Sequence, residues 1–313
     1  MAESTALEAL TVSAPATSAN LGPGFDCLAV AIDLGNAVVI NRRPGPLEVR
    51  VTGEGAGEVP EDETNLVCRA LESGLGTLDG LAIECRNRIP LGRGLGSSAA
   101  AVCSGLVAAN ALGGLRWTPD DILARATEIE GHADNAAACL LGGLVAVGPG
   151  PTGRLIAVPD ELSFIAVIPD ARTSTDTARR ALPSEVPLAD AAATLANAVG
   201  LTLALCEGRL EDVPPFLVDH LHEPHRAPLI PGVEVIRGLV DGHDCLGATI
   251  SGSGPAMLLW CLQDASDRVA AAAEEALAAA GIAARVRPSR RSAAGVRARW
   301  TGGSDLRLAR AVG

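Results

Sequence analysis

Lysine is absent from this 313-residue chain, and all 25 of its basic side chains are arginines. Pyridoxal phosphate enzymes need a lysine for their Schiff base, and P-loop NTPases and protein kinases need one to pair with phosphate. The absence of lysine therefore excludes all three classes. Tyrosine is also absent, and only three phenylalanines and three tryptophans occur. Since 48% of the residues are hydrophobic, the core is predicted to consist of Leu, Val, Ile and Ala.

Basic charge is scarce as well, because 25 basic residues stand against 37 acidic ones and the net charge is −12. A protein that binds nucleic acid needs a basic surface and often aromatic rings on which bases stack. The composition therefore predicts no nucleic-acid partner. The segment from Arg285 onward is a local exception, with eight arginines against one aspartate. It is predicted to form a solvated face or an edge strand, and nucleic-acid contact is the less favoured alternative.

The eight cysteines include no C-x-x-C pair and mostly lie in apolar runs, so they are predicted to be reduced core residues. No signal peptide is predicted, because the opening stretch MAESTALEAL has neither a basic segment nor a long apolar segment. No uncharged apolar run reaches the ~18 residues that a membrane helix needs. The sequence therefore predicts a cytoplasmic protein with no membrane partner.

The order of the segments indicates an α+β protein of two domains, since a typical domain has ~150 residues. The predicted domains are residues 1–155 and 156–313, with the stretch VGPGPTGR (147–154) as the junction. In LAIECRNR, alternate apolar side chains beginning at Leu81 predict a half-buried strand. The other main predictions are buried or amphipathic helices at Ala99–Leu112, 119–130, 188–208 and 267–280, and a strand pair around Gly247–Cys261.

Glycines are concentrated between the predicted strand and the helix that begins near Ala99. The loop Gly92–Ser98 reads GRGLGSS, which is neither the dinucleotide pattern G-x-G-x-x-G nor a loop ending in G-K-[ST]. Glycines let backbone N–H groups approach a phosphate, and the start of a helix favours an anion. The Ser98 hydroxyl is a candidate ligand for Mg²⁺. The alternative is a tight turn without a ligand.

Two glutamates close the predicted helix at 119–130, which has Thr118 as N-cap and Gly131 as terminator. At 100° per residue, Glu130 falls on the apolar side and Glu128 points away. A carboxylate on the buried side must be paired, hydrogen-bonded or bound to a metal. Glu130 is therefore a candidate Mg²⁺ ligand. A buried Glu–Arg pair and a frayed last turn are the alternatives.

Further polar clusters occur at the ends of predicted elements. EGHADN places His132, Asp134 and Asn135 at the start of a small-residue helix, where a simple N-cap is the alternative. The stretch SANLGPGFD places Asn20 and Asp26 in a Gly-Pro-Gly turn, and GATISGSGPAMLLW is a second glycine–serine loop. The histidines of DHLHEPHR suggest a zinc site only weakly, because a proline interrupts the helix and the spacing fits no known site well.

Taken together, these stretches resemble the GHMP kinases over nearly the whole chain. The family motif P-x-x-x-G-L-G-S-S-A is met by Pro90 through Ala99, and its third motif by Ser251 through Pro255. The resemblance implies a two-domain α+β fold, with an S5-like N-terminal domain and a ferredoxin-like C-terminal domain. It also implies that ATP binds without a lysine and that Ser98 and Glu130 hold Mg²⁺. The residues that it implies for ATP binding are Asn65, Pro90, Leu91, Gly92, Arg93, Gly94, Leu95, Gly96, Ser97, Ser98, Ala99 and Ala100.

Within the family, four segments are most similar to the branch that phosphorylates L-homoserine in threonine biosynthesis: PATSANLGPGFD, GHADN, STDTARRALP and HEPHRAPLIPG. This similarity implies that one set of residues surrounds the amino and hydroxyl groups of the substrate and another set its carboxylate. The first set is Asn20, Asp26, His132 and Asn135; the second is Thr175, Arg179 and Arg226; and Gly252 also contacts the substrate. Asn135 and Arg179 are the implied catalytic residues.

Asn135 stands where sugar-kinase members of the family place a catalytic aspartate. An amide cannot act as a general base, so the hydroxyl proton is expected to pass directly to the phosphate, a route that phosphoryl transfer tolerates. Arg237, eleven residues after Arg226, is expected to have no part in the site. The alternatives are another small-molecule kinase of the family, for L-threonine or mevalonate, and an inactive relative that senses a ligand. The oligomeric state stays open, with a homodimer as one possible state.

Overall fold

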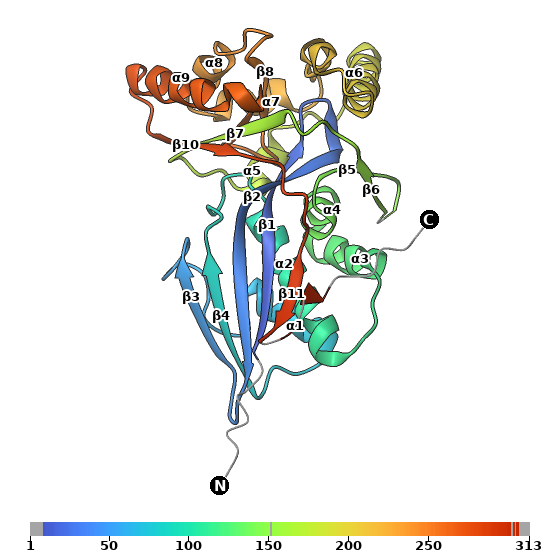
Figure 1. Ribbon diagram of the computed structural model, residues 1–313, viewed down its shortest axis with the longest axis vertical. Coiled ribbons are helices and arrows are strands. Elements are labelled where there is room, and N and C mark those ends of the chain that lie inside the picture. Colours follow the sequence, from blue (N-terminus) through green and yellow to red (C-terminus); the bar gives the residue numbers. More distant parts are fainter. Residues whose placement is uncertain (1–8, 151, 302, 304, 307–313) are drawn as a thin grey trace.

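The computed structural model describes residues 9–150, 152–301, 303 and 305–306, and it contains two β-sheets stacked along the long axis of the molecule (Figure 1). The expected α+β class is confirmed, since the structure combines an eight-stranded and a four-stranded sheet with helices on them. Each sheet has its own cluster of buried apolar side chains. The N-terminal stretch from which no signal peptide is predicted lies largely outside the described residues.

The first sheet has the strand order β12-β11-β1-β2-β4-β3, and β5 and β6 extend it from β2. Its strands are β1 (Leu10–Asn20), β2 (Gly24–Arg42), β3 (Glu48–Gly53), β4 (Leu81–Asn87), β5 (Leu144–Val147), β6 (Gly153–Ile156), β11 (Arg297–Trp300) and β12 (Asp305–Leu306). The strand expected from Leu81 is confirmed as β4, in which Leu81, Ile83 and Cys85 are buried while Arg86 is exposed.

Four helices cover one face of this sheet (Figure 1). They are α1 (Leu66–Leu75), α2 (Ser97–Gly113), α3 (Pro119–Glu130) and α4 (Asp134–Leu141). The buried helix expected at Ala99–Leu112 is confirmed as α2. In α3 the Thr118 side chain accepts a hydrogen bond from Asp121 N, and Asp121 in turn binds Thr118 N, which completes a capping box. Gly131 ends this helix in the left-handed conformation, as predicted.

The second sheet is antiparallel throughout, with the order β10-β7-β9-β8. Its strands are β7 (Leu162–Pro169), β8 (Cys245–Ile250), β9 (Met257–Leu262) and β10 (Ala284–Ser289). The helices of this half are α5 (Thr175–Arg180), α6 (Leu188–Cys206), α7 (Glu223–Arg226), α8 (Val233–Arg237) and α9 (Ser266–Ala279). The strand pair and the two long helices predicted here are confirmed as β8–β9, α6 and α9.

The predicted junction at 147–154 is wrong, because this stretch is the turn of the β5–β6 hairpin. Val147 pairs with Gly153, so both sides of the turn belong to the first sheet. Glycine and proline suit a hairpin turn as well as a linker, and local composition does not separate the two. The chain passes to the second sheet between β6 and β7. The boundary at 155/156 stays a prediction, and it does not account for β11, which returns to pair with β1.

The cores consist mainly of aliphatic side chains, as the composition predicts. The largest buried ring, Trp260, packs edge-on against Phe164 with 5.1 Å between the ring centroids, and its Nε1 donates to Thr249 Oγ1 at 3.0 Å.

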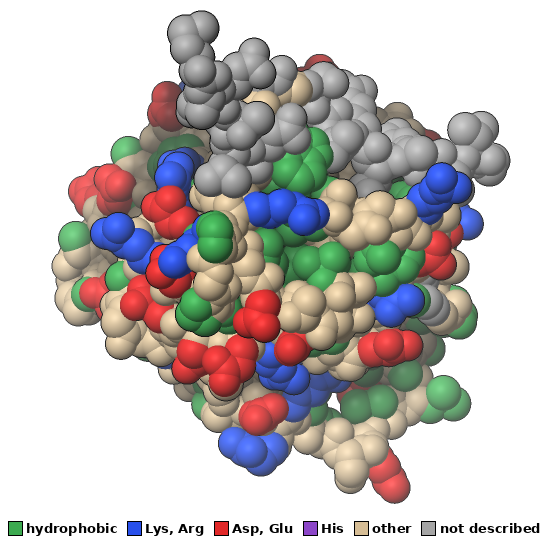
Figure 2. Space-filling view, turned by 90° about the horizontal axis from the view of Figure 1, so that it is seen from below, with side chains coloured by type: hydrophobic (Ala, Val, Ile, Leu, Met, Phe, Trp, Pro, Cys, Tyr) green, Lys and Arg blue, Asp and Glu red, His purple; other side chains and the backbone are tan. Residues whose placement is uncertain are grey.

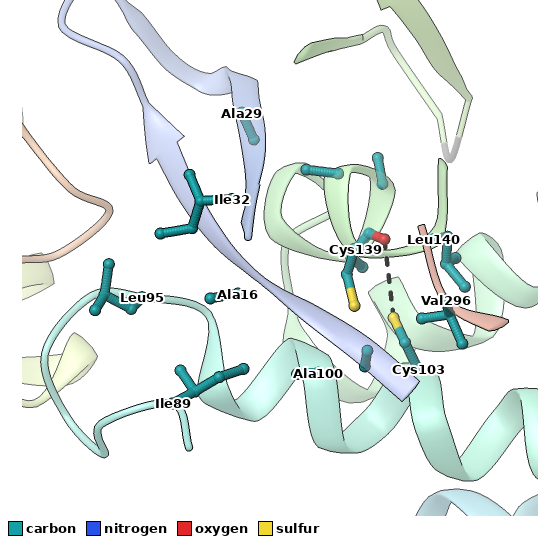
Figure 3. Packing of buried hydrophobic residues seen from close by; sticks show 14 of the residues in the cluster. Ala16, Ala29, Ile32, Ile89, Leu95, Ala100, Cys103, Cys139, Leu140 and Val296 are labelled. Carbon is teal, nitrogen blue, oxygen red and sulfur yellow. Dashed lines mark hydrogen bonds between the residues drawn. The ribbon is translucent and has the colours of Figure 1, made fainter. Parts of the chain in front are cut away.

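Six of the eight cysteines are buried, whereas Cys27 is half-buried and Cys206 exposed. Figure 3 shows Cys103 and Cys139 side by side between α2 and α4, where the Cys103 thiol reaches the Ala136 carbonyl. These cysteines fill space in the core.

Charged side chains of both signs are interspersed over the face shown in Figure 2. The edge-strand prediction for the arginine-rich segment is confirmed for β10, which lies at the edge of the second sheet. Arg285 on this strand pairs with Glu54 at 2.7 Å. The last two of the eight arginines, Arg307 and Arg310, lie outside the described residues.

The helix α6 is long and apolar enough to span a membrane by length and composition, and only 22% of its most apolar 18-residue stretch is buried.

Candidate active site

The glycine loop connects β4 to α2 and is held at both ends by buried side chains. Ile89 and Leu95 are inserted into the core beneath the loop (Figure 3). Gly92 and Gly94 between them, and Gly96 directly after Leu95, have φ values of 62°, 76° and 67°, which favour glycine. Gly96 is the N-cap of α2, and the first turn of this helix has no side-chain cap and no acidic residue. The helix therefore presents unpaired N–H groups to an anion.

The loop fits closely against the second glycine–serine loop, which belongs to the other sheet. A Cβ atom on Gly94 would lie 2.1 Å from Ser251 O, so no other residue fits there. The Ser251 hydroxyl donates to Gly94 O at 2.7 Å, and Ala256 N donates to Arg93 O at 3.1 Å. The two loops therefore form one unit that joins the two domains.

Arg93 takes part in this joint through its side chain. Its guanidinium donates to the carbonyls of Leu91, Pro169 and Asp170 at 2.8 to 2.9 Å. The side chain is thus committed to the end of β7, and only the backbone of Arg93 is available to a nucleotide.

A cleft of about 220 Å³ lies along the two loops. The predicted site residues that line it are Asn20, Asp26, Pro90, Gly92, Arg93, Gly94, Leu95, Gly96, Ser97, Ser98, Ala99, Glu130, His132, Asn135, Thr175, Arg179, Arg226 and Gly252. Three predicted ATP contacts do not line it. Leu91 lies outside it, Ala100 is fully buried in α2, and Asn65 caps α1 by accepting from Val67 N while its amide donates to Pro60 O.

Ser98 and Glu130 meet at the mouth of this cleft. The Ser98 hydroxyl donates to Glu130 Oε1 at 2.5 Å, although the two residues come from different helices, α2 and α3. Glu128 is exposed and faces away, as the helical periodicity predicts. The two predicted metal ligands are thus adjacent, and their oxygen atoms are those that Mg²⁺ prefers.

The turn between β1 and β2 supplies the opposite side of the cleft. Asn20 and Asp26 have left-handed φ values of 72° and 54°, which are uncommon for residues other than glycine. The Asn20 side chain holds the turn, because its Nδ2 donates to Gly252 O at 2.8 Å and its Oδ1 accepts from Asp26 N at 3.0 Å. The Asp26 carboxylate binds Arg179 through two hydrogen bonds of 2.9 Å. The resemblance to the family implies that these two side chains face different ends of the substrate, whereas the structure places them in one ion pair.

Arg226 is a buried cation at the inner end of the cleft, only 3% exposed. Its guanidinium donates to Gly252 O at 3.0 Å and approaches Ala178 O and His222 Nδ1. It forms no salt bridge with any carboxylate of the described residues. Burial lowers the pKa of Arg226, and the nearby charge of Arg179 lowers it further. A buried charge is normally paired, so this site favours an anionic group from a ligand.

His132, Asp134 and Asn135 lie at the start of α4, where the N-cap position is taken by Ala133 without a side-chain hydrogen bond. His132 Nδ1 lies 3.2 Å from Asp134 Oδ1, and this carboxylate raises the pKa of His132. His132 therefore keeps its proton to a higher pH than an ordinary histidine. Asp134 Oδ1 also accepts from Asn135 N at 2.7 Å.

Thr17, buried in β1, is a site residue that the sequence analysis missed. Its hydroxyl donates to Asn135 Oδ1 at 2.7 Å. A Cβ atom on Gly96 would lie 1.9 Å from Thr17 Oγ1, so the glycine loop also depends on this contact. With Oδ1 occupied and Nδ2 donating to Asp134 Oδ1 at 3.4 Å, the Asn135 amide has one N–H left for a ligand in the cleft. The only signal in the sequence was the position of Thr17 within the PATSAN stretch.

Among the histidines of DHLHEPHR, His222 supports the cleft from behind. His222 is buried and its ring stacks on Phe25 with 5.1 Å between the ring centroids. Its Nε2 lies 2.9 Å from Gly22 O in the Gly-Pro-Gly turn. Its neighbour Glu223 is also buried, accepts from Ile250 N at 2.7 Å and pairs with Arg237 at 3.1 Å. Arg237 does not line the cleft, so the expectation that it has no part in the site stays a prediction, and its only link to the site among the described residues is through Glu223. Its ion pair steadies the strand that leads into the second glycine–serine loop.

A larger cavity, of about 930 Å³, lies at the other end of the second sheet. Its lining includes six acidic residues and one arginine, and no glycine loop opens into it. The helix α9 begins there at Ser266, but its first turn carries the acidic Asp267. Among the residues that the structure describes, arginines line other hollows as well, but the smaller cleft combines them with the glycine loop and the uncapped start of α2. The smaller cleft is therefore the candidate active site.

Comparison with known proteins gives two family matches. The family profile of the GHMP kinases N terminal domain matches residues 64–143, and that of the GHMP kinases C terminal domain matches residues 201–282. The chain is 43% identical over 285 residues to a homoserine kinase of Streptomyces avermitilis, covering 87% of this chain and 92% of that protein. A homoserine kinase of Streptomyces coelicolor is 42% identical, covering 85% and 88%.

Among solved structures, a homoserine kinase from Cytophaga hutchinsonii superposes with a TM-score of 0.86 and 31% identity. The match covers 96% of this chain and all of the other. The fold described above is thus the two-domain fold of these proteins.

Proposed function

This chain belongs to the GHMP kinase family, and we propose that it transfers the γ-phosphoryl group of ATP to the hydroxyl of L-homoserine. The products are O-phospho-L-homoserine and ADP, and the reaction serves threonine biosynthesis in the cytoplasm. Relatives of 42–43% identity that span most of both chains, and a solved neighbour of 31% identity, carry the name of this activity. In the structure, the buried Arg226 without a carboxylate partner carries the proposal for an amino-acid substrate.

On the nucleotide side, the glycine loop and the first turn of α2 hold the phosphates of ATP. The backbone N–H groups and the helix dipole replace the lysine of other phosphate loops. This role follows from the conformation of Gly92, Gly94 and Gly96, and from the uncapped start of α2. Because Asn65 has both side-chain groups engaged in capping α1, it contributes to this half by shaping the chain and does not offer the nucleotide a free amide.

Ser98 and Glu130 fit a Mg²⁺ ion that is bound together with ATP. Among the described residues, no group of three or more His, Cys, Asp or Glu side chains could hold a metal ion alone. One hydroxyl and one carboxylate would suit Mg²⁺ when phosphate oxygens and water supply its remaining ligands. When bound, the ion supplies positive charge that neutralises the transferring phosphoryl group.

On the substrate side, Arg226 and Arg179 bind the carboxylate of homoserine, and Thr175 lies beside them. Arg226 is preorganised, because Gly252 O and the surrounding core fix its guanidinium. Arg179 is half-exposed and forms an ion pair with Asp26. Arg179 and Asp26 therefore neutralise each other before substrate binds. Asp26, Asn20 and His132 face the amino and hydroxyl end.

Asn135 orients the hydroxyl that attacks ATP. Thr17 occupies Oδ1 and one N–H of Nδ2 is directed at Asp134 Oδ1, so the second N–H donates to the hydroxyl oxygen and leaves its other lone pair for the phosphorus atom. Asn135 accepts no proton, so the hydroxyl proton leaves with a phosphate oxygen. Positioning and charge neutralisation then carry most of the catalysis.

The proposed reaction is tested with a substrate panel. The purified enzyme with ATP and Mg²⁺ is expected to release ADP with L-homoserine far faster than with L-threonine or mevalonate. Coupled ADP detection and mass spectrometry of the product measure this. ADP release with mevalonate or L-threonine but not with L-homoserine would assign the chain to another branch of the family. No release with any alcohol would favour a ligand sensor.

The metal role of Glu130 is tested against Glu128 on the same helix. Glu130→Gln is expected to lose about 3 kcal/mol of transition-state stabilisation, roughly a hundredfold in kcat, because a charge facing the phosphates is removed. Glu128→Gln, on the exposed side, is expected to keep its activity. The kcat values and their dependence on Mg²⁺ concentration are measured for both. Equal activity of the two variants would contradict the assignment.

The carboxylate role of Arg226 is tested with Arg226→Ala. Loss of one partner of a buried charge pair costs about 2–5 kcal/mol, so KM for homoserine is expected to rise by roughly thirtyfold or more. KM for ATP should change little. Arg180→Ala is the control, because Arg180 is exposed on α5 and does not line the cleft. A purely structural Arg226 would lower the melting temperature and leave both KM values unchanged.

Thr17 is expected to act as a positioning residue for Asn135. Thr17→Val keeps the shape of the side chain but leaves Asn135 Oδ1 without its donor, and a lost hydrogen bond of this kind costs about 1–3 kcal/mol. A fall in kcat of about tenfold is expected, with KM for ATP nearly unchanged. Thr17→Ser restores the hydroxyl and should restore most of kcat. If the serine and valine variants are equally slow, the hydroxyl is not the important group.

A further inference from the structure

Phe25, at the start of β2, contacts both of the arginines that are proposed to bind the substrate carboxylate. The guanidinium carbon of Arg179 lies 5.5 Å from the centroid of its ring, and that of Arg226 lies 5.4 Å from the same centroid. Both distances are within the ~6 Å at which the negative face of an aromatic ring attracts a cation. Among the described residues, no other ring lies under two guanidinium groups.

The two guanidinium groups carry the same charge in one cleft and repel each other. Burial and then the charge of Arg179 lower the pKa of Arg226. Asp26 neutralises Arg179 through two hydrogen bonds, whereas Arg226 forms no salt bridge with a carboxylate of the described residues. A ring that attracts both cations therefore offsets part of their repulsion before an anionic ligand binds.

The Phe25 ring is itself held in place by His222. The two rings stack with an angle of 24° between their planes. His222 Nε2 carries a proton, because its partner Gly22 O can only accept a hydrogen bond. Burial lowers the pKa of His222, so the ring is neutral and its Nδ1 faces Arg226 Nη1 as an acceptor at 3.4 Å. One neutral imidazole thus supports both the phenyl ring and a guanidinium.

Phe25 acts through the arginines, because it is not among the residues that line the cleft. Arg226 uses Nε and Nη1 in its hydrogen bonds, and its Nη2 makes none to the described residues. Arg179 uses both terminal nitrogens for Asp26. A carboxylate is bound by a planar fork of N–H groups, so the plane in which each guanidinium lies decides how well the remaining N–H groups meet it.

We propose that Phe25 is the positioning residue of the carboxylate site, and that its ring sets the place and plane of both guanidinium groups. The inference rests on the proposed function and adds a source of specificity to it. Phe25 then strengthens binding of an amino acid and leaves binding of the same alcohol without a carboxylate unchanged. A leucine at this position fills much of the same space but has no π face, so packing and the attraction of cations can be separated.

The first experiment compares Phe25→Leu with the unmodified enzyme. KM for L-homoserine is expected to rise about tenfold, equal to about 1.4 kcal/mol, as the loss of two cation–π contacts implies. The values of kcat and of KM for ATP should change little. Propanolamine, which is homoserine without its carboxylate, is added as a competitor, and its inhibition constant should be the same for both proteins.

Two further variants serve as controls in the same assay. Phe25→Tyr keeps the π face and should keep KM for L-homoserine near that of the unmodified enzyme. Phe216→Leu removes a ring that is also half-buried, but this ring packs against Gly200 of α6 and has no guanidinium over it. It should leave both KM values unchanged. Melting temperatures establish that all variants are folded.

The second experiment replaces Phe25 alone with phenylalanines that carry one, two or three ring fluorines, through a reassigned codon. Fluorine withdraws negative charge from the face of the ring and nearly preserves its shape, so KM for L-homoserine should rise stepwise with each fluorine. A residue that only fills space would give a flat series.

Several results would overturn the inference. They are an unchanged KM for L-homoserine in Phe25→Leu, an equal loss of affinity for propanolamine, and a flat fluorine series. A lower melting temperature of Phe25→Leu with both KM values unchanged would show a structural role only. If the unmodified protein releases no ADP with L-homoserine, the proposed function and this inference fail together. Normal turnover of L-homoserine with a flat series contradicts this inference alone.

Discussion

The contact between Gly94 and the loop Ser251–Gly254 is the constraint on which the arrangement of the site depends. A single Cβ atom at Gly94 would overlap the Ser251 carbonyl, so the approach of the two domains is set by backbone against backbone. The Ser251 hydroxyl and the Arg93 guanidinium then hold the joint from both sides. Because Gly252 O also accepts hydrogen bonds from the side chains of Asn20 and Arg226, the same loop positions the residues proposed to bind substrate. One short segment thus places the phosphate loop and the carboxylate site in fixed relation.

Much of the fold could be predicted from the sequence, because the signals are local. The alternation that starts at Leu81, the N-cap at Thr118 and the apolar run of α2 each specify an element without reference to the rest of the chain. The side of α3 on which Glu130 lies also follows from periodicity alone. The turn at 147–154 was misassigned because glycine and proline suit a linker and a hairpin equally well, and only strand pairing separates them.

The parts of the site that could not be predicted involve contacts between distant segments. Thr17 and Asn135 are 118 residues apart, and nothing near either residue indicates that one holds the other. Arg93 lies within a phosphate-loop motif, yet its side chain binds carbonyls 76 residues later. Arg237 has an ordinary helical neighbourhood, and its importance depends on the burial of Glu223. The motif specifies where the backbone goes, whereas tertiary contacts decide which side chains remain available.

The carboxylates and the histidine near the proposed position of the substrate hydroxyl are already paired, so none of them suits the role of general base. Asp26 is engaged by both terminal nitrogens of Arg179, and Asp134 by His132 and Asn135 N. His132 has a raised pKa, since Asp134 stabilises its protonated form, so it suits donation better than proton abstraction. Asn135 presents an N–H group because Thr17 occupies its oxygen. Each candidate acceptor is therefore already paired, and the acceptor that remains for the hydroxyl proton is the phosphate itself. Catalysis then rests on how rigidly the two joined loops hold the reactants in place.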